Sequence, residues 1–454
     1  MTIKVPCGER SGCVKVPASK SWAHRMLITA ALSAEKSELM CDGISNDISA
    51  TIKCLNAMGA YITISEAGTV SDAAAQNTGN MVIHVSPIKK IIDHSNERAL
   101  YAPLLCGESG STLRFLIPIA GALGINAAFH MEGRLSKRPL GPLIDVLSEH
   151  GLSFFQDGDI LYCRGQLECG SFDIPGNISS QYVSGLLMAL PMLPGSSVLN
   201  VTGTVESGDY IEMTVKAVEQ AGIRFERNGF CFKIEGNQSF KTSKCLEVEK
   251  DWSSAAFPLC MGAFSDNGMT VTGLNMDSVQ GDKEIINILK GFGAGVEIRS
   301  QSANTKEAQD EIADITVRKG NLKGQVIDAS RIPDLVPVIS VVAAGAKGKT
   351  SIINAGRLRL KESDRLATTT AMLKALGADI EETEDGLVIN GSRDEESPML
   401  SGGTAESFND HRIAMSAAVA AGIATGDVTV MGTECTDKSF PGFWSMLENL
   451  KISE

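Results

Sequence analysis

The chain has 454 residues and a formal net charge of -13, with 54 Asp and Glu residues against 41 Lys and Arg residues. This acidic balance argues against nucleic acid as the main partner, and no apolar run reaches the length of a membrane-spanning helix. The length predicts two domains rather than one. With 43% hydrophobic residues, only 5% aromatic residues and 45 glycines, the composition predicts tightly packed α/β units.

The eleven cysteines form no Cys-x-x-Cys pair, and the six histidines are scattered. This usage predicts reduced, mostly buried thiols. The opening residues do not resemble a secretion signal, so we expect a cytoplasmic protein. The chain has neither a His-x-x-x-His pair nor a Gly-x-x-x-x-Gly-Lys-Ser/Thr loop, which argues against a metal centre and against a nucleoside triphosphatase.

A sixfold repeat runs through the chain. Each copy has a β-like run that ends in Gly, a polar patch and a helix, and the helix closes with Gly in the first five copies. The β-like runs are predicted at residues 38–43, 128–133, 198–203, 269–273, 350–356 and 428–432. The closing glycines are Gly59, Gly151, Gly222, Gly293 and Gly377, and the last helix runs through Leu447.

A second, more apolar helix precedes the β-like run of each copy. These helices are predicted at residues 21–32, 111–123, 180–193, 253–264, 334–346 and 410–423. A helix that is apolar on all sides is buried, whereas an amphipathic helix faces outward. Each copy is therefore a βαβαβ-type module of about 70 to 90 residues. Six modules predict two domains of three, with a boundary near residue 245.

Polar residues gather where the buried helices are predicted to begin. For each Ser or Asp the alternative is an ordinary N-cap. Caps do not explain the cations, because a cation in the first turn opposes the helix dipole at roughly 0.3–1 kcal/mol. We therefore expect anions to bind there. The cations are Lys20, Arg25 and Arg412, and further cations follow the β-like runs at Lys137, Arg138, Lys361, Arg365 and Lys438.

Residues 357–366 carry the densest set of charges, and a helix that ends at Gly377 follows them. Lys361 and Arg365 are four apart, so on a helical turn they would share one face, with Glu362 beside them. Two cations beside a carboxylate could hold a phosphorylated substrate while the carboxylate moves a proton. From these residues alone, a solvated and salt-bridged helix start stays open as the alternative.

Six short motifs resemble those of the enolpyruvyl transferase family, and within it the branch that acts on shikimate 3-phosphate. They are residues 18–21 with Arg25, 134–139, 179–181, 360–365, 409–412 and 438–441. The resemblance runs nearly end to end. It implies two inside-out α/β domains, each of three βαβαββ modules, with the active site in the interdomain cleft. Residues 1–18 and 245–454 would form the domain with both termini, and residues 19–244 the inserted domain.

The resemblance also implies a reaction. The enolpyruvyl group of phosphoenolpyruvate would pass to the 5-hydroxyl of shikimate 3-phosphate through a tetrahedral intermediate, with release of phosphate, in aromatic amino acid (chorismate) biosynthesis. It implies no metal or organic cofactor. From the composition we expect no nucleic acid or membrane partner, and we expect a monomer. Both substrates carry a phosphate and a carboxylate, which suits clustered cations.

Roles carry over residue by residue from the resemblance. Asp334 is the expected base at the 5-hydroxyl, Glu362 the expected acid at the methylene carbon of phosphoenolpyruvate, and Lys20 an additional catalytic residue. Asp364 is expected to be structural. Phosphoenolpyruvate would be bound by Lys20, Arg138, Arg365, Arg412 and Lys438, with Gly110 leaving it room. Shikimate 3-phosphate would be bound by Ser21, Arg25, Ser179, Ser180, Ser207, Asp334 and Lys361, and Gln181 would touch both.

Three positions depart from the family pattern: Glu108 and Arg357 stand where Asn is usual, and Ser111 stands where Thr is more usual. The nearest alternative is the branch that acts on UDP-N-acetylglucosamine. That branch usually has Lys-Asn where this chain has Lys-Ser, and often has a reactive Cys in the loop that here spans residues 133–138 without one. A non-catalytic anion-binding repeat protein is the alternative from another class, and it would need the cations but not Asp334 and Glu362.

Overall fold

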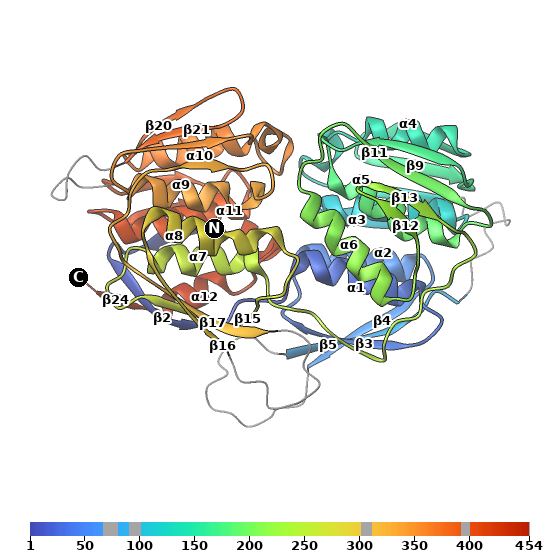
Figure 1. Ribbon diagram of the computed structural model, residues 1–454, viewed down its shortest axis with the longest axis horizontal. Coiled ribbons are helices and arrows are strands. Elements are labelled where there is room, and N and C mark those ends of the chain that lie inside the picture. The colour runs from blue at the N-terminus through green and yellow to red at the C-terminus, as the bar shows by residue number, and fades with distance from the viewer. Residues whose placement is uncertain (67–79, 90–100, 301–310, 392–399, 454) are drawn as a thin grey trace. The chain divides into compact units, whose positions relative to one another are not determined.

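The computed structural model describes residues 1–66, 80–89, 101–300, 311–391 and 400–453 (Figure 1). The chain folds into two compact units. Among the described residues, the terminal unit contains 1–19 and those from 249 onwards, and the central unit contains 20–248. All eleven cysteines are free thiols and six of them are buried, as predicted. Within the described segments, no helix combines the length and apolar character needed to cross a membrane.

The described residues of the central unit form three four-stranded sheets, and the middle module shows how each is built. Parallel strands β6 and β7 are joined by α3, and α4 then leads into the antiparallel hairpin of β8 and β9. The sheet order is β6-β7-β9-β8, which is one βαβαββ path. The elements are β6 (Ala102–Gly107), α3 (Gly110–Ala122), β7 (Ala127–Met131), α4 (Gly141–Glu149), β8 (Leu152–Asp157) and β9 (Ile160–Gly165).

The next module repeats this path, with sheet order β10-β11-β13-β12. Its elements are β10 (Ser171–Pro175), α5 (Ser180–Ala189), η2 (Leu190–Met192), β11 (Ser197–Thr202), α6 (Gly208–Gln220), β12 (Glu226–Asn228) and β13 (Cys231–Ile234). The first module takes its outer strand from the far end of the unit, because β14 pairs in parallel with β3. Its elements are α1 (Lys20–Leu32), β3 (Ser37–Asp42), α2 (Asn46–Ala57), β4 (Tyr61–Glu66), β5 (Asn80–Ser86) and β14 (Cys245–Glu247).

The terminal unit has one module with the same complete path, in the sheet order β18-β19-β21-β20. Its elements are β18 (Val326–Asp328), η4 (Pro333–Leu335), α9 (Val336–Ala344), β19 (Lys349–Ile353), η5 (Gly356–Leu360), α10 (Arg365–Ala375), β20 (Asp379–Glu382) and β21 (Leu387–Asn390).

The other two sheets of the terminal unit include strands from the start of the chain. Strand β2 lies between β15 and β24, and β1 pairs with β23. The strands are β1 (Thr2–Val5), β2 (Glu9–Val14), β15 (Met269–Asn275), β16 (Gly295–Ser300), β17 (Ile312–Arg318), β22 (Gly403–Glu406), β23 (Val428–Met431) and β24 (Lys451–Ser453). The helices are α7 (Trp252–Gly262), η3 (Gly281–Glu284), α8 (Ile285–Phe292), α11 (His411–Ala420), η6 (Ala421–Ile423), η7 (Thr433–Lys438) and α12 (Phe443–Glu448).

The predicted pairs of helices are confirmed in all six modules. The apolar helices are α1, α3, α5, α7, α9 and α11, and every residue of α7, α9 and α11 is buried. The second helices expose one face, as in α6, where six of thirteen residues are buried. The closing glycines are also confirmed as helix ends. Their φ angles lie between 83° and 103°, the left-handed conformation that glycine adopts at a helix C-terminus without strain.

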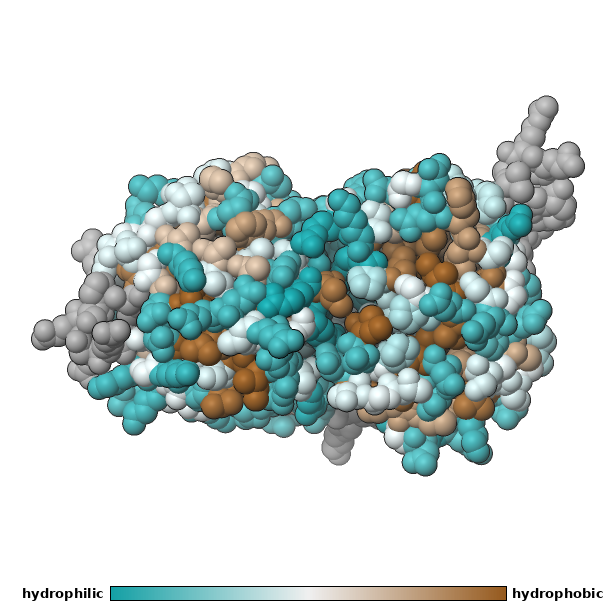
Figure 2. Space-filling view, turned by 90° about the horizontal axis from the view of Figure 1, so that it is seen from above, coloured by the Kyte–Doolittle hydropathy of each residue, from teal (hydrophilic) through white to brown (hydrophobic). Residues whose placement is uncertain are grey.

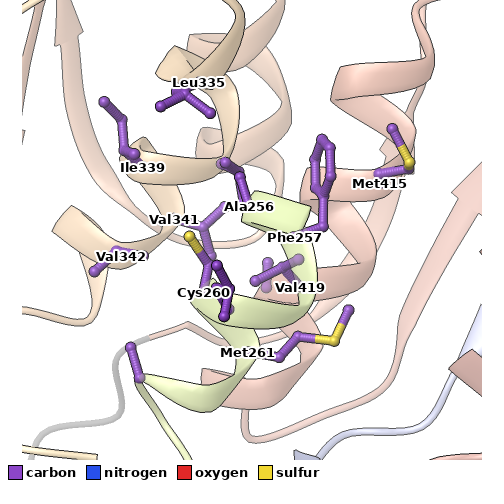
Figure 3. Close-up of a cluster of buried hydrophobic side chains, with 14 of the residues drawn as sticks. Ala256, Phe257, Cys260, Met261, Leu335, Ile339, Val341, Val342, Met415 and Val419 are labelled. Atoms are coloured by element: carbon purple, nitrogen blue, oxygen red, sulfur yellow. The ribbon is translucent and has the colours of Figure 1, made fainter. Parts of the chain in front are cut away.

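The core of the terminal unit forms where α7, α9 and α11 contact one another (Figure 3). Phe257 of α7 is 1% exposed, and its ring centroid lies 6.2 Å from that of Phe443. Hydrophilic residues instead occupy much of the face drawn in Figure 2, between smaller hydrophobic patches. The sequence pattern predicts that these helices are buried, and their burial is the main contribution to the stability of the folded unit.

Truncating Phe257 is expected to destabilise the terminal unit strongly. Phe257→Ala leaves a cavity among three packed helices, so the free energy of unfolding in urea should fall by about 3–5 kcal/mol. Phe155→Ala is the control, because Phe155 is 66% exposed, and the loss there should stay below about 1 kcal/mol. Equal losses in the two variants would contradict the burial of Phe257 among these helices.

Candidate active site

The residues that the sequence singles out fall into two groups, one in each compact unit. The terminal unit holds Asp334, Lys361, Glu362, Arg365, Arg412 and Lys438. The central unit holds Lys20, Ser21, Arg25, Gly110, Arg138, Ser179, Ser180, Gln181 and Ser207.

Arg365 lies at the centre of the terminal group, and its side chain is 1% exposed. Its guanidinium donates from Nη1 to Asp334 Oδ1 at 2.6 Å, from Nη2 to Glu362 Oε2 at 2.7 Å and from Nε to Asp410 Oδ2 at 2.8 Å. Burial alone would lower the pKa of Arg365, but the three carboxylates outweigh burial and raise that pKa above its ordinary value. One planar cation therefore fixes Asp334 and Glu362 on separate nitrogens.

Asp334 accepts hydrogen bonds from three cationic side chains. Besides Arg365, Oδ2 accepts from Arg412 Nη2 at 3.1 Å and Oδ1 lies 3.5 Å from Lys361 Nζ. Its backbone carbonyl accepts from Arg412 Nη1 at 3.1 Å. Burial lowers the pKa of Lys361 to about 8, although the charge of Asp334 acts in the opposite direction. The structure thus brings five of the six residues of this group together, Glu362 included.

The segment from Lys361 to Arg365 is not a helical turn, so the prediction that these two residues share a helical face is wrong. Helix η5 ends before Lys361, whose ψ of -160° is extended, and α10 begins at Arg365. The reason is Asp364, which caps α10 by accepting from the backbone N of Ala367 and so starts a new helix. Asp364 is structural, as expected, and it pairs with Arg359 at 3.2 Å.

Asp410 is fully buried and accepts hydrogen bonds on both carboxylate oxygens. It caps α11 by accepting from the backbone N of Arg412 at 3.0 Å, and Oδ2 also accepts from Ser363 Oγ at 3.0 Å. Burial would raise the pKa of Asp410, but the charge of Arg365 outweighs burial and holds it below the ordinary value. Asp410 therefore joins the start of α11 to the start of α10.

Two residues in the left-handed region lead the chain into α11. Phe408 has a φ of 52° and Asn409 a φ of 56°. Asn tolerates this conformation, whereas for Phe it costs on the order of 1–3 kcal/mol. The carbonyl of Asn409 accepts a hydrogen bond from Lys438 Nζ at 2.9 Å. Lys438 is thereby tied to the loop that positions Asp410.

A further buried acid, Asp282 of η3, interacts electrostatically with this group. It is 3% exposed, and one of its oxygens accepts a hydrogen bond from Ser253 Oγ of α7. Its other oxygen, Oδ1, is buried and has no hydrogen-bond partner among the described residues. Burial raises the pKa of Asp282 to about 7, and the negative charge of Asp334 adds to this effect.

In the central unit, two cations of α1 have polar partners. Lys20 Nζ lies 3.0 Å from Asp47 Oδ2 of α2. Arg25 is 2% exposed, and burial lowers its pKa to about 9. Its hydrogen bonds tie α1 to α5 through the hydroxyl of Ser184 and to α6 through the carbonyl of Tyr210 and the hydroxyl of Thr214. A further bond runs within α1 to the carbonyl of Ser21.

Gly110 begins α3 against two guanidinium groups. A Cβ atom at this position would lie 2.6 Å from Arg114 Nη1 and 2.8 Å from Arg138 Nη1. The carbonyl of Pro139 accepts from Tyr182 Oη at 2.5 Å and from Arg114 Nη2 at 3.1 Å. The structure therefore brings Gly110 and Arg138 together and fixes the backbone next to Arg138.

The starts of α5 and α6 hold the remaining predicted residues. Ser179 caps α5 by accepting from the backbone N of Gln181 at 3.3 Å, and Gln181 Nε2 donates to Ser111 Oγ of α3 at 2.9 Å. Ser180 is the first residue of α5. Ser207 precedes α6 with a φ of 52°, and its hydroxyl is buried without a hydrogen-bond partner in the described parts of the chain. A buried, unpartnered hydroxyl favours a polar ligand at this point.

Sequence reasoning missed the residues that hold the predicted ones in place. Asp410 and Arg114 lie in the polar helix starts, but their contacts to other modules are not visible in the sequence. Asp47 and Tyr182 carry no motif. For Asp47, the one indication was its position in the first turn of a helix, where an acid is common.

Comparison with known proteins identifies the family. Residues 6–447 match the family model of EPSP synthase (3-phosphoshikimate 1-carboxyvinyltransferase). The chain belongs to the EPSP synthase family. Proteins named 3-phosphoshikimate 1-carboxyvinyltransferase from Clostridium acetobutylicum and Clostridium beijerinckii are 41% and 39% identical to it. The first match covers 97% of this chain and 95% of its relative, and the second covers 99% and 97%.

A solved structure of EPSP synthase from Acinetobacter baumannii, at 2.37 Å, matches the whole of both chains with a TM-score of 0.76 and 25% identity. The mixed α/β fold, with six small sheets in the part of the chain that the structure describes, agrees with that family. The chain transfers the enolpyruvyl group of phosphoenolpyruvate to the 5-hydroxyl of shikimate 3-phosphate and releases phosphate, a step of chorismate biosynthesis. These matches support neither the UDP-N-acetylglucosamine branch nor a non-catalytic binding protein.

Asp282→Asn is expected to change how stability depends on pH. Asp282 has a pKa of about 7 in the folded chain against an ordinary 3.8, so its contribution to stability is complete below about pH 3.8 and is lost as the pH rises through about 7. Asn keeps an acceptor for Ser253 but cannot ionise. Relative to the unchanged chain, the variant should gain about 3 kcal/mol of stability between pH 5 and pH 8, because about two pH units of the interval between the unfolded and folded pKa values lie in this range.

Urea denaturation at pH 5 and pH 8 measures this gain. Asp266→Asn is the control, because Asp266 is 79% exposed and should show little change with pH. If the free energies of unfolding of the Asp282 variant and the unchanged chain differ by the same amount at both pH values, the raised pKa of Asp282 is contradicted.

Proposed function

We propose that the two groups of residues form one active site, in the cleft between two inside-out α/β domains of three βαβαββ modules each. The domains would follow the two compact units. The observation that carries the assignment is the Arg365 guanidinium, which binds Asp334 and Glu362 on separate nitrogens at 2.6 and 2.7 Å. Such an arrangement suits a reaction that needs one carboxylate as a base and another as an acid.

Phosphoenolpyruvate would be bound by the cations of both groups, namely Lys20, Arg138, Arg365, Arg412 and Lys438. Guanidinium groups suit its carboxylate and phosphate because they can pair with two oxygens at once. Arg365 and Arg412 now bind the carboxylate of Asp334. Donor binding would therefore exchange an internal carboxylate for a substrate anion and leave the oxygens of Asp334 free for the acceptor hydroxyl.

Shikimate 3-phosphate would be bound by Ser21, Arg25, Ser179, Ser180, Ser207, Asp334 and Lys361, with Gln181 touching both substrates. Several of these residues stand at helix starts, where free N–H groups favour a phosphate. The buried, unpartnered hydroxyl of Ser207 supports a polar ligand there. The charge of Lys361 suits an anionic acceptor below about pH 8, the value to which burial lowers its pKa.

In the proposed mechanism, Glu362 gives its proton to the methylene carbon of phosphoenolpyruvate, with Lys20 assisting. The adjacent carbon becomes electrophilic, the 5-oxygen bonds to it, and Asp334 takes the proton of that hydroxyl. Loss of a proton from the new methyl group and of phosphate from the tetrahedral intermediate then forms the enol ether. Each carboxylate step contributes about 10²–10⁴-fold to the rate.

Glu362→Gln and Asp334→Asn are each expected to lower kcat by at least ~100-fold, because the amides keep the shape of the side chain but cannot transfer the proton. Phosphate release under saturating substrates measures kcat, and equilibrium binding should show both substrates still bound. Asp364→Asn is the matched control, since Asp364 caps α10 and pairs with Arg359. Near-normal turnover in either test variant removes that residue from its role.

Acceptor choice tests the function itself. The unchanged chain with phosphoenolpyruvate should release phosphate when shikimate 3-phosphate is added and none when UDP-N-acetylglucosamine is added. The two acceptors differ in where their phosphates lie, so a site built for one leaves buried polar groups unpaired with the other. Phosphate release with UDP-N-acetylglucosamine but not with shikimate 3-phosphate would overturn the assignment of shikimate 3-phosphate as the acceptor.

A further inference from the structure

A buried chain of hydrogen bonds joins three helices of the central unit. His24 Nδ1 of α1 lies 2.8 Å from Thr51 Oγ1 of α2, and Thr51 Oγ1 lies 2.7 Å from Thr112 Oγ1 of α3. The Thr112 hydroxyl donates to Ser109 Oγ, the N-cap of α3, at 2.7 Å. All four side chains are at most 1% exposed. None of them is among the residues assigned to either substrate.

The chain of hydrogen bonds has one direction. Thr112 gives its single hydroxyl proton to Ser109, so it must accept from Thr51, and Thr51 must accept from His24 Nδ1. Burial, with the charges of nearby cations, holds the pKa of His24 well below its usual range, so the imidazole is neutral. His24 therefore carries its proton on Nδ1. Thr51 and Thr112 each donate and accept, which strengthens the bonds along the chain.

Thr51 also belongs to the face of α2 that holds Lys20. Asp47 lies one turn before Thr51, and its carboxylate pairs with Lys20 Nζ at 3.0 Å. His24 lies one turn after Lys20 on α1. The same two helices are therefore joined twice, by an ion pair at the helix starts and by the His24–Thr51 hydrogen bond one turn further on.

At its other end the chain of hydrogen bonds reaches Ser109, which directly precedes Gly110. The backbone at Gly110 lies against the guanidinium of Arg138. A shift of the α3 start would therefore change the space beside Arg138. Arg25, which is proposed to bind shikimate 3-phosphate, is held by other contacts. Its hydrogen bonds go to Ser184 of α5 and to Tyr210 and Thr214 of α6.

We propose that Thr51 is a positioning residue for phosphoenolpyruvate: its hydroxyl fixes the start of α1, with Lys20, relative to the start of α3, with Gly110. This inference rests on the proposed donor assignment of Lys20 and Gly110. Thr51 acts through these residues and does not touch the substrate. The proposed role of Thr51 concerns only the binding of phosphoenolpyruvate, not that of shikimate 3-phosphate.

Thr51→Val tests this role, because Val has the shape of Thr without the hydroxyl. The variant loses the hydrogen bonds of Thr51 to His24 Nδ1 and to Thr112 Oγ1, while Thr112 keeps its bond to Ser109. The KM for phosphoenolpyruvate should rise by about 5–30-fold, while the KM for shikimate 3-phosphate stays within about twofold. Thr51→Ser keeps the hydroxyl and should restore the KM for phosphoenolpyruvate to within about threefold.

Thr270→Val is the matched control, since it removes one of a pair of hydroxyls 2.8 Å apart in the terminal unit, Thr270 and Thr316, and should leave both KM values unchanged. If circular dichroism shows that Thr51→Val does not fold, Thr112→Val breaks the same chain at its next hydroxyl and carries the same expectation. An unchanged KM for phosphoenolpyruvate, or an equal rise in both KM values, overturns the proposal.

Lys20→Met separates this proposal from the assignment on which it rests. It should raise the KM for phosphoenolpyruvate or abolish turnover. If it does neither, the donor assignment of Lys20 is wrong, whatever Thr51→Val shows. If Lys20→Met has its expected effect and Thr51→Val leaves the donor KM unchanged, the assignment stands and the positioning role of Thr51 is overturned.

Discussion

The terminal group depends on one constraint, the neutralisation of a buried arginine. The Arg365 side chain is 1% exposed, and a guanidinium taken out of water is costly unless carboxylates surround it. Asp334, Glu362 and Asp410 meet this need from η4, from the extended segment before α10 and from the start of α11. Removing one partner of a buried ion pair costs about 3–5 kcal/mol because the other charge is left buried and unpaired, so these contacts restrict how the two neighbouring modules can lie relative to each other.

The repeat explains why these charges meet. Each module buries its first helix on all sides, and in the terminal unit α7, α9 and α11 contact one another. Because these helices hold equivalent places in their modules, polar groups at their starts are gathered by packing alone. Ser253 contacts Asp282 at α7, Asp334 precedes α9, and Asp410 caps α11. An apolar core thus brings together charged side chains from segments that lie far apart in the sequence.

The sequence predicted the helices and their order because their apolar patterns and closing glycines are local. The resemblance to the family also singled out Asp334, Lys361, Glu362, Arg365 and Arg412, and the structure brings these five side chains together. Their roles in the reaction stay predictions. The prediction that Lys361 and Arg365 share one helical turn failed. The same residues could continue a helix or begin a new one, and Asp364 caps a new helix. Sequence reasoning could not find partners set by tertiary pairing. Strand β14 pairs with β3 from the far end of its unit, and Asp47, which binds Lys20, looks like an ordinary first-turn acid.

The two arginines proposed to bind phosphoenolpyruvate in the terminal unit already have a carboxylate partner, and this affects the affinity for the substrate. Under the proposed assignment, phosphoenolpyruvate competes with Asp334 for Arg365 and Arg412, so only the difference between the two sets of contacts contributes to binding. An anion that engages one cation would gain little over the internal ion pair. A ligand with both a carboxylate and a phosphate could replace several contacts at once and release Asp334 as a base. The internal carboxylates would then favour the doubly anionic substrate over simple anions, and they would couple donor binding to the availability of the base.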